Sequence, residues 1–144
     1  MEKLNSIIFY NIDKAIRTYR NYAQKRLRKC NFKITIDQWL TIKAILENPG
    51  ISQKALGEKI FKDNASVTRI IEHLVRSKYL IREVNEKDRR KSTLKVTSEG
   101  KSIIGQVQHL VLENRKVALN NIPPGDLEIM VRSLRKIIEN CQIK

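Results

Sequence analysis

The sequence predicts a mainly α-helical fold with one small β-hairpin, an α+β arrangement, and three observations predict it. Apolar residues recur every three or four positions through most of the chain, as they do along one face of a helix. Pro and Gly residues that interrupt helices are confined to a few points: 48–50, around 100 and 123–125. Residues 79–97 instead hold two short segments on either side of a polar tip, which is typical of a hairpin.

The first two helices are predicted over residues 4–29 and 36–47. The first keeps apolar residues at helical spacing throughout. The second follows Thr35 and Gln38, whose spacing is that of a capping box, and the Asn-Pro-Gly run at 48–50 ends it. The core candidates of this second helix are Trp39, Leu40, Ile42 and Ile45.

A pair of helices separated by a short break comes next. Ser52 is a good N-cap for a short helix over residues 53–60. After the break at residues 61–63, another helix is predicted to continue to about Lys78. Its apolar stripe has the spacing of a single buried helix face. The stripe consists of Val67, Ile70, Ile71, Leu74 and Val75.

The hairpin is predicted to consist of residues 79–84 and 92–97, with residues 85–91 at its tip. Thr97 is a suitable cap for a helix that reaches about Leu119, and a last amphipathic helix follows the proline pair. Two short helices followed by a basic hairpin give the outline of a winged helix-turn-helix.

This order of elements predicts three regions. Residues 1–33 form an N-terminal dimerisation helix, residues 34–99 form the winged helix-turn-helix domain, and residues 100–144 form C-terminal dimerisation helices. Amphipathic flanking helices that bury nothing in their own winged domain need a partner surface, and two-fold pairing is the commonest solution. The alternative is that these helices only cover the core of a monomer.

The composition favours a polyanionic partner. The chain has 29 Lys and Arg against 15 Asp and Glu, a net charge of +14, and such a field attracts nucleic acid or an anionic membrane surface. The alternative is a cationic surface that only keeps the protein soluble. No segment is long and apolar enough to span a bilayer, and the N-terminus lacks a signal-peptide pattern, so we expect a cytoplasmic protein.

The sequence indicates neither catalysis nor a metal or cofactor site. It has no phosphate-binding Gly-rich loop, and no pair of catalytic residues stands out by spacing. Cys30 and Cys141 lack a CxxC pattern and a neighbouring His cluster, and His73 and His109 have no partners at metal-ligand spacing. We therefore expect no enzyme activity, no cofactor and no metal.

The polar side of the helix after the break supplies the first candidate binding residues. Small hydroxyl and amide groups approach bases and phosphates closely, and Arg pairs bidentately with the O6 and N7 atoms of guanine. The free N–H groups at the start of a helix also suit phosphate. The alternative is an ordinary solvated helix face. The candidates are Asn64, Ser66, Thr68, Arg69 and His73.

The hairpin tip supplies the second set. Four of its residues are basic, and a narrow minor groove has an enhanced negative potential that accepts an inserted Arg. Asp88 would repel DNA unless it holds a neighbouring guanidinium in place, which lowers the cost of ordering that side chain. The alternative is a solvated charge run with a weak surface ion pair. The candidates are Lys87, Asp88, Arg89, Arg90 and Lys91.

The run from Ile34 to Ile104 resembles the MarR family of bacterial regulators. The D-x-R pattern at the hairpin tip, with T-x-x-G downstream, is the more specific part of the resemblance. The outer helices are similar only in length, placement and amphipathic pattern. The matching stretches are Ile51-Ser52-Gln53, Leu56, Asn64-Ala65-Ser66-Val67-Thr68-Arg69-Ile70-Ile71, Leu74, Leu80-Ile81, Asp88-Arg89-Arg90, Leu94, Val96-Thr97 and Gly100.

The resemblance implies a homodimer that binds double-stranded DNA. Its outer helices would interlock, and its two winged domains would lie in successive major grooves, about one helical turn apart. Ser66, Thr68 and Arg69 would lie in the major groove, and Arg90, braced by Asp88, would enter the minor groove.

The resemblance also implies a small aromatic ligand between the dimerisation and winged regions. Four aromatic residues are candidates for lining such a site, and the alternative is that they only fill the core. They are Tyr10, Tyr19, Tyr22 and Trp39.

The sequence therefore predicts a sequence-specific regulator of transcription, a repressor that acts as a homodimer on a pseudo-palindromic operator and is relieved by a small ligand. Two other classes stay open. A non-specific architectural or nucleoid DNA-binding protein would share the charge and the fold. A winged helix used as a protein-interaction module would share the fold but not the salt-sensitive binding of DNA.

Overall fold

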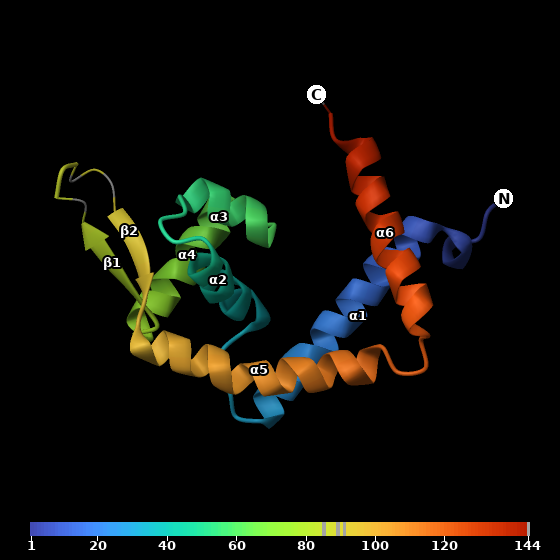
Figure 1. Ribbon diagram of the computed structural model, residues 1–144, viewed down its shortest axis with the longest axis horizontal. Helices are drawn as coiled ribbons and strands as arrows, with labels where there is room; N and C mark the ends of the chain where they lie inside the picture. Colours follow the sequence, from blue (N-terminus) through green and yellow to red (C-terminus); the bar gives the residue numbers. More distant parts are fainter. Residues whose placement is uncertain (85, 89, 91, 144) are drawn as a thin grey trace. The chain divides into compact units, whose positions relative to one another are not determined.

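The computed structural model describes residues 1–84, 86–88, 90 and 92–143 of the chain (Figure 1). The fold is mainly α-helical with a two-stranded antiparallel hairpin, as predicted. The chain forms two compact units, Met1–Leu112 and Glu113–Lys144. Helix α5 (Ser98–Ala118) begins in the first unit and ends in the second.

The first unit contains the predicted winged helix-turn-helix elements in the predicted order. A short 3-10 turn comes first, and the helices α1 to α4 are followed by the hairpin strands β1 and β2 and by the start of α5. The bounds are η1 Leu4–Ser6, α1 Ile8–Lys29, α2 Ile36–Glu47, α3 Gln53–Ile60, α4 Asn64–Arg76, β1 Leu80–Val84 and β2 Ser92–Val96.

Side-chain caps start the helices of the winged region. The Thr35 hydroxyl accepts from the Gln38 backbone N–H at 3.1 Å, and the Gln38 side chain accepts from the Thr35 backbone N–H at 3.0 Å. This reciprocal pair is the predicted capping box of α2. The Ser52 hydroxyl accepts from the Ala55 N–H at 3.1 Å and so caps α3 as predicted.

Two helix ends differ from the prediction. The first helix does not begin at Leu4, because Ile7 is extended (φ −77°, ψ 119°) and separates the 3-10 turn from α1. The Asn11 side chain donates to the carbonyl oxygens of Asn5 and Ile7, which stabilises this break. Helix α4 ends at Arg76, because Lys78 adopts a left-handed conformation (φ 65°) that turns the chain into the hairpin.

The base of the hairpin is joined to the start of α5. Leu80 pairs with Val96 at the base of the antiparallel ladder, the end away from the hairpin loop. Beside this pair, the Thr97 hydroxyl donates to the Lys78 carbonyl at 2.6 Å and accepts from the Gly100 N–H at 3.0 Å. Thr97 therefore caps α5, as predicted, and at the same time ties α5 to the turn between α4 and β1.

One hydrophobic core holds α2, α3, α4 and the hairpin base together. Its members come from every one of these elements, and the apolar stripe predicted for α4 faces it. Helix α2 is buried on more than one side, because Thr41 and Gln38 are buried along with its apolar residues. The residues with the least exposure are Ile34, Thr41, Ile42, Leu56, Val67, Ile71, Leu74, Leu80 and Val107.

The second unit contains helix α6 (Pro124–Cys141), which begins with a proline at its first position, where the missing N–H costs nothing. None of the described residues of α6 is buried. Across the described residues, no helix has both the length and the apolar character that crossing a bilayer requires.

Close packing explains the glycine at position 100. A Cβ atom there would lie 2.4 Å from the Tyr79 carbonyl oxygen and 2.7 Å from the Val96 side chain. The carbonyl belongs to the hairpin base, so it moves only if the strand moves. Gly105 of the same helix has nothing within 4 Å of a Cβ at its position.

We expect Gly100→Ala to lower the free energy of unfolding by at least about 2 kcal/mol, because the added methyl group overlaps the hairpin backbone. The matched control is Gly105→Ala, which should raise the free energy of unfolding by about 0.5–1 kcal/mol, because Ala is more stable than Gly in a helix interior. Urea unfolding followed by circular dichroism measures both. Equal stability of the two variants would contradict this account of the joint between α5 and the hairpin.

Candidate nucleic-acid interface

The candidate residues of α4 lie on the side of the helix that the core leaves open. Asn64, Arg69 and His73 are exposed, and Ser66 and Thr68 are half-buried. The structure brings all of these residues except His73 into hydrogen-bonded sets that involve their neighbours. The His73 side chain lies one turn beyond Arg69 and takes no part in these bonds within the described part of the chain.

The first set begins at the N-cap of α4. One carboxylate oxygen of Asp63 accepts from the Ser66 backbone N–H at 2.8 Å, and the other accepts from the Ser66 hydroxyl at 3.1 Å. The Arg69 guanidinium in turn donates to the Ser66 hydroxyl oxygen at 3.2 Å. The guanidinium is therefore held near the start of the helix before any ligand binds, which reduces the ordering cost of binding.

Electrostatics at this cap favour a charged carboxylate. The pKa of Asp63 lies below its usual value, mainly because of the backbone hydrogen bond from Ser66 and then because of the Ser66 hydroxyl, with a further electrostatic effect of Arg69. From the sequence, Asp63 is expected only in the break before the helix. An Asp directly before an apolar-periodic segment is the signal that identifies such a cap.

The second set joins α3 to α4. The Gln53 side-chain amide donates to the Asn64 side-chain oxygen and to the Thr68 hydroxyl oxygen, both at 2.8 Å. The Thr68 hydroxyl donates to the Asn64 backbone carbonyl at 2.9 Å. Gln53 is thus a functional candidate that the sequence analysis missed, because nothing in the local sequence indicates a contact with residues so far along the chain.

An ion-pair network fixes the turn before α4. The Asp37 carboxylate, in the first turn of α2, pairs with the Arg20 guanidinium of α1 and with the Lys62 ammonium group at 3.2 Å. These side chains are about one-third exposed, so each pair adds little to stability. The main effect of the network is geometric, because it links α1 and α2 to the backbone segment that leads into α4.

The hairpin tip is exposed at each of its described candidate positions, Lys87, Asp88 and Arg90. The Asp88 carboxylate accepts from the Arg90 backbone N–H at 3.1 Å, a local turn that shapes the tip. The predicted bracing of a guanidinium by Asp88 stays a prediction. The candidates Arg89 and Lys91 lie outside the described residues.

The arrangement suits recognition of an anion more than catalysis. The described residues contain no group of three His, Cys, Asp or Glu side chains that would hold a metal ion. Cys30 and Cys141 are exposed thiols. What the surface offers is the Arg69 guanidinium, held beside the capped start of α4, and a hairpin with basic side chains.

The lowered pKa of Asp63 predicts a specific pH dependence of stability. Because the folded-state pKa lies below the unfolded value of about 4, the charged cap stabilises the fold above about pH 4 and is lost as pH falls through the folded pKa. Asp63→Asn keeps a capping oxygen but does not titrate.

The stability difference between wild type and Asp63→Asn should therefore shrink on acidification below about pH 4. Thermal unfolding of both chains at several pH values measures it. A difference that is constant across this range would show that the carboxylate charge contributes nothing to the cap.

Comparison with known proteins shows which family the winged region is similar to. Residues 32–91 match the sequence model of the MarR family. The chain is 28% identical over 104 residues to SarZ of Staphylococcus aureus, a helix-turn-helix transcriptional regulator. That alignment covers 72% of this chain and 66% of SarZ, just under two thirds of its length.

Solved structures show the same fold over nearly the whole chain. One of them is BpsR of Bordetella bronchiseptica, whose DNA binding is regulated by 6-hydroxynicotinic acid. BpsR is 19% identical to this chain and superposes with a TM-score of 0.84, and the match covers 95% of this chain and 96% of the BpsR chain. MepR of S. aureus, solved in complex with DNA, is 18% identical to this chain with a TM-score of 0.81. The match covers 97% of this chain and 100% of the MepR chain. Through its winged region at residues 32–91, this chain is therefore similar to the MarR family.

Proposed function

We propose that this protein binds double-stranded DNA and regulates transcription. The observation that carries the proposal is the exposed side of α4, where Asp63 and Gln53 hold four candidate side chains in two hydrogen-bonded sets. A net charge of +14 supplies the general attraction to a polyanion. Similarity to SarZ and to the DNA complex of MepR supports the same function.

Within this proposal, α4 enters the major groove and the hairpin lies against the neighbouring minor groove. The N-terminal residues of a recognition helix are the ones that reach base edges, and here they are the ordered ones. Arg90 is exposed at the hairpin tip, where it is able to enter a narrow minor groove. In this proposal, residues 34–99 form the DNA-binding domain.

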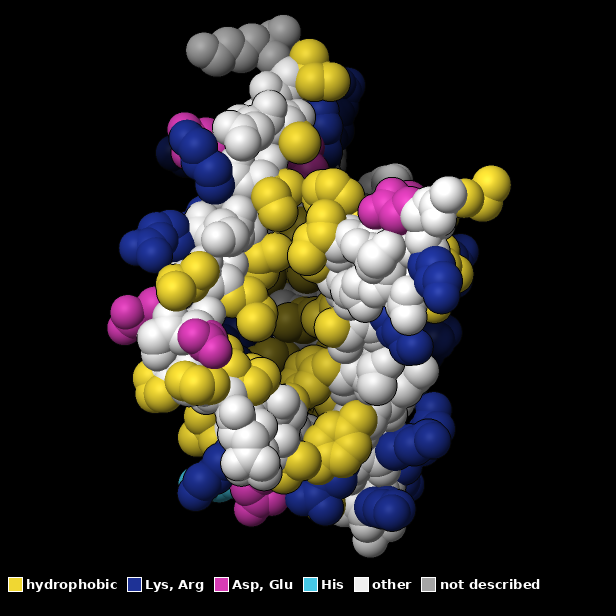
Figure 2. All heavy atoms as spheres, turned by 90° about the vertical axis from the view of Figure 1, so that its right-hand side faces the viewer, with side chains coloured by type: hydrophobic (Ala, Val, Ile, Leu, Met, Phe, Trp, Pro, Cys, Tyr) yellow, Lys and Arg dark blue, Asp and Glu magenta, His cyan; other side chains and the backbone are white. Residues whose placement is uncertain are grey.

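We further propose that the protein is a homodimer, formed through the regions 1–33 and 100–144. Large apolar side chains lie open to solvent in both units (Figure 2). Soluble proteins rarely expose such side chains in continuous stripes unless a partner covers them. In α6 the stripe has helical spacing and consists of Met130, Val131, Leu134 and Ile138.

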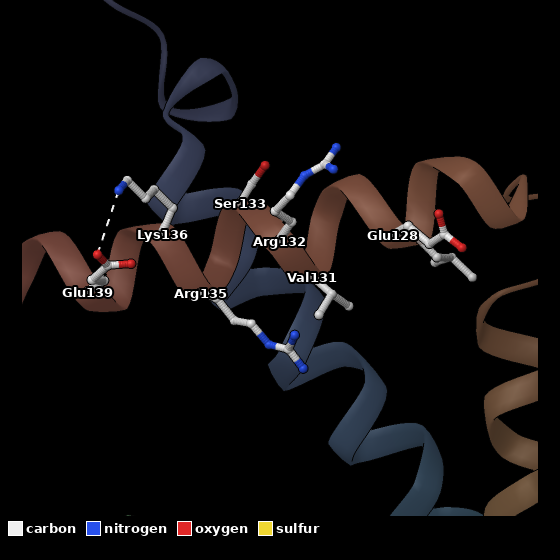
Figure 3. A pocket seen from close by; sticks show the side chains of 8 residues that line it. Glu128, Val131, Arg132, Ser133, Arg135, Lys136 and Glu139 are labelled. Carbon is white, nitrogen blue, oxygen red and sulfur yellow. Dashed lines mark ion pairs between the residues drawn. The ribbon is translucent and has the colours of Figure 1, made fainter.

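A second copy of this chain is the occupant that fits these stripes best. The stripes lie on helices that flank the winged domain, so a two-fold pairing would place two winged domains on one duplex. The opposite side of α6 is charged, with an ion pair between Lys136 and Glu139 at 3.7 Å (Figure 3). That side suits solvent, so α6 presents one face to water and one to a partner.

The finer proposal is repression from a pseudo-palindromic operator, relieved by a small aromatic ligand. The regulation of BpsR by 6-hydroxynicotinic acid supports ligand control. Such a ligand changes DNA affinity only if it binds the DNA-competent and incompetent conformations with different affinity. Tyr10, Tyr19 and Tyr22 are half-buried and Trp39 is buried, so they are candidates for its site.

Arg90→Ala should weaken binding of the selected duplex by about tenfold or more, because a contact in the minor groove is lost. The control is Arg17→Ala, which removes the same charge from α1, where Arg17 pairs with Asp13. Fluorescence anisotropy at fixed salt measures both affinities. Equal weakening by the two variants would mean that only total charge matters and would count against the wing.

Selection of bound duplexes from a random pool distinguishes a specific regulator from an architectural protein. We expect a symmetric site that is bound at least about 1,000-fold more tightly than random DNA at the same salt concentration. A ratio near one would favour the architectural alternative, and absence of salt-sensitive binding would favour a protein-interaction module.

Leu134→Lys should weaken the homodimer at least about tenfold, because it places a charge in the apolar stripe of α6. Ile129→Lys is the matched control, since Ile129 is also exposed but lies five residues earlier, on the other side of the helix. Sedimentation equilibrium measures both. A monomeric wild type, or equal effects of both substitutions, would contradict the assignment of this interface.

A further inference from the structure

We propose that α4 reads a thymine in each half-site through its 5-methyl group, with Thr68 and Ala65 as the residues that contact it. The inference rests on the proposed DNA-binding function and names one base that the recognition helix selects. It follows from the direction of the hydrogen bonds around Thr68 and not from residue type alone.

The hydroxyl group of Thr68 is already occupied inside the protein. Its hydrogen is donated to the Asn64 backbone carbonyl at 2.9 Å, and its oxygen accepts from the Gln53 amide at 2.8 Å. A threonine hydroxyl has one hydrogen to donate, so Thr68 has no donor left for a base. The hydroxyl and the methyl group share one Cβ atom, so fixing one branch fixes the other. Thr68 is half-buried, and its methyl branch is the part free of hydrogen bonds.

A second methyl group lies next to it. Ala65 is exposed and lies three positions before Thr68, on the same side of the helix. Both residues are in the first turns of α4, the part of a recognition helix that reaches base edges. In the proposed complex both methyl groups contact the base, since apolar contact from Ala and from the Thr methyl group is how proteins read the thymine methyl.

The groups around these two methyl groups are donors. The Asn64 side-chain oxygen accepts from Gln53 at 2.8 Å, which turns its amide hydrogens away from α3. The Arg69 guanidinium consists only of donors. In the major groove, cytosine and adenine present amino groups that donate, whereas thymine presents the O4 acceptor beside its methyl group. Thymine is therefore the base whose edge matches both the donors and the methyl groups.

The test replaces thymine by uracil, which removes only the 5-methyl group. The site selected from a random pool by the wild-type chain is resynthesised with single thymines changed to uracil, in both half-sites together. We expect one thymine position at which uracil lowers affinity by about fourfold per half-site, as expected for one buried methyl group.

Two variants assign this effect to Thr68. Thr68→Ser keeps the hydroxyl and its two hydrogen bonds but lacks the methyl group, so its preference for the thymine duplex over the uracil duplex should be clearly smaller than that of the wild type, with the remainder contributed by Ala65. Thr68→Val keeps a methyl group at that place without the hydroxyl, so it should retain the preference for thymine. Circular dichroism of both variants checks that α4 is folded.

The outcomes of these tests distinguish the thymine methyl contact from the proposed DNA-binding function on which it rests. If the wild-type chain binds its selected duplex but no uracil replacement matters, or if Thr68→Ser keeps the full preference, the methyl contact is wrong while DNA binding stands. If the chain binds no duplex in a salt-sensitive way, the proposed function fails and the inference fails with it.

Discussion

The rotation of α4 about its own axis is the constraint on which the candidate surface depends. Val67, Ile71 and Leu74 are 0% exposed, and their spacing commits one side of the helix to the core. Side chains on a helix keep fixed angular positions, so burial of these three determines which polar groups face outward. The cap at Asp63 fixes the point where the helix begins. Burial thus sets the rotation and the cap sets the start, and the hydrogen-bonded sets follow from both.

Local signals in the sequence predicted most of the fold, because the interactions behind them join residues that are close together in the chain. The Thr35–Gln38 box and the Ser52 cap involve groups three residues apart, and both occur as predicted. The hairpin and the helices around it follow from periodicity and from a few Pro and Gly residues. The start of α1 was mispredicted, because the break at Ile7 depends on side-chain bonds from Asn11 that periodicity does not register.

The candidate site was only partly predictable for the same reason. Residue type and position on α4 identify Asn64, Ser66, Thr68 and Arg69 as candidates. They do not identify Gln53, because its bonds to α4 exist only after α3 and α4 have packed against each other. The link from Asp37 to Lys62 and Arg20 is likewise a product of the fold, since it joins three separate elements. Sequence patterns therefore locate a surface, whereas the direction in which each group donates or accepts requires coordinates.

The joint at Thr97 has a mechanical consequence. Its hydroxyl bonds both to Lys78 in the α4–β1 turn and to Gly100, the third residue of α5, and the absence of a side chain at Gly100 lets these backbones touch. Stretching these short hydrogen bonds costs energy, so we expect the hairpin base and the first turn of α5 to move together as one rigid body. A tilt of α5 at this end would therefore be transmitted to the hairpin tip, and the length of the strands would enlarge the displacement there.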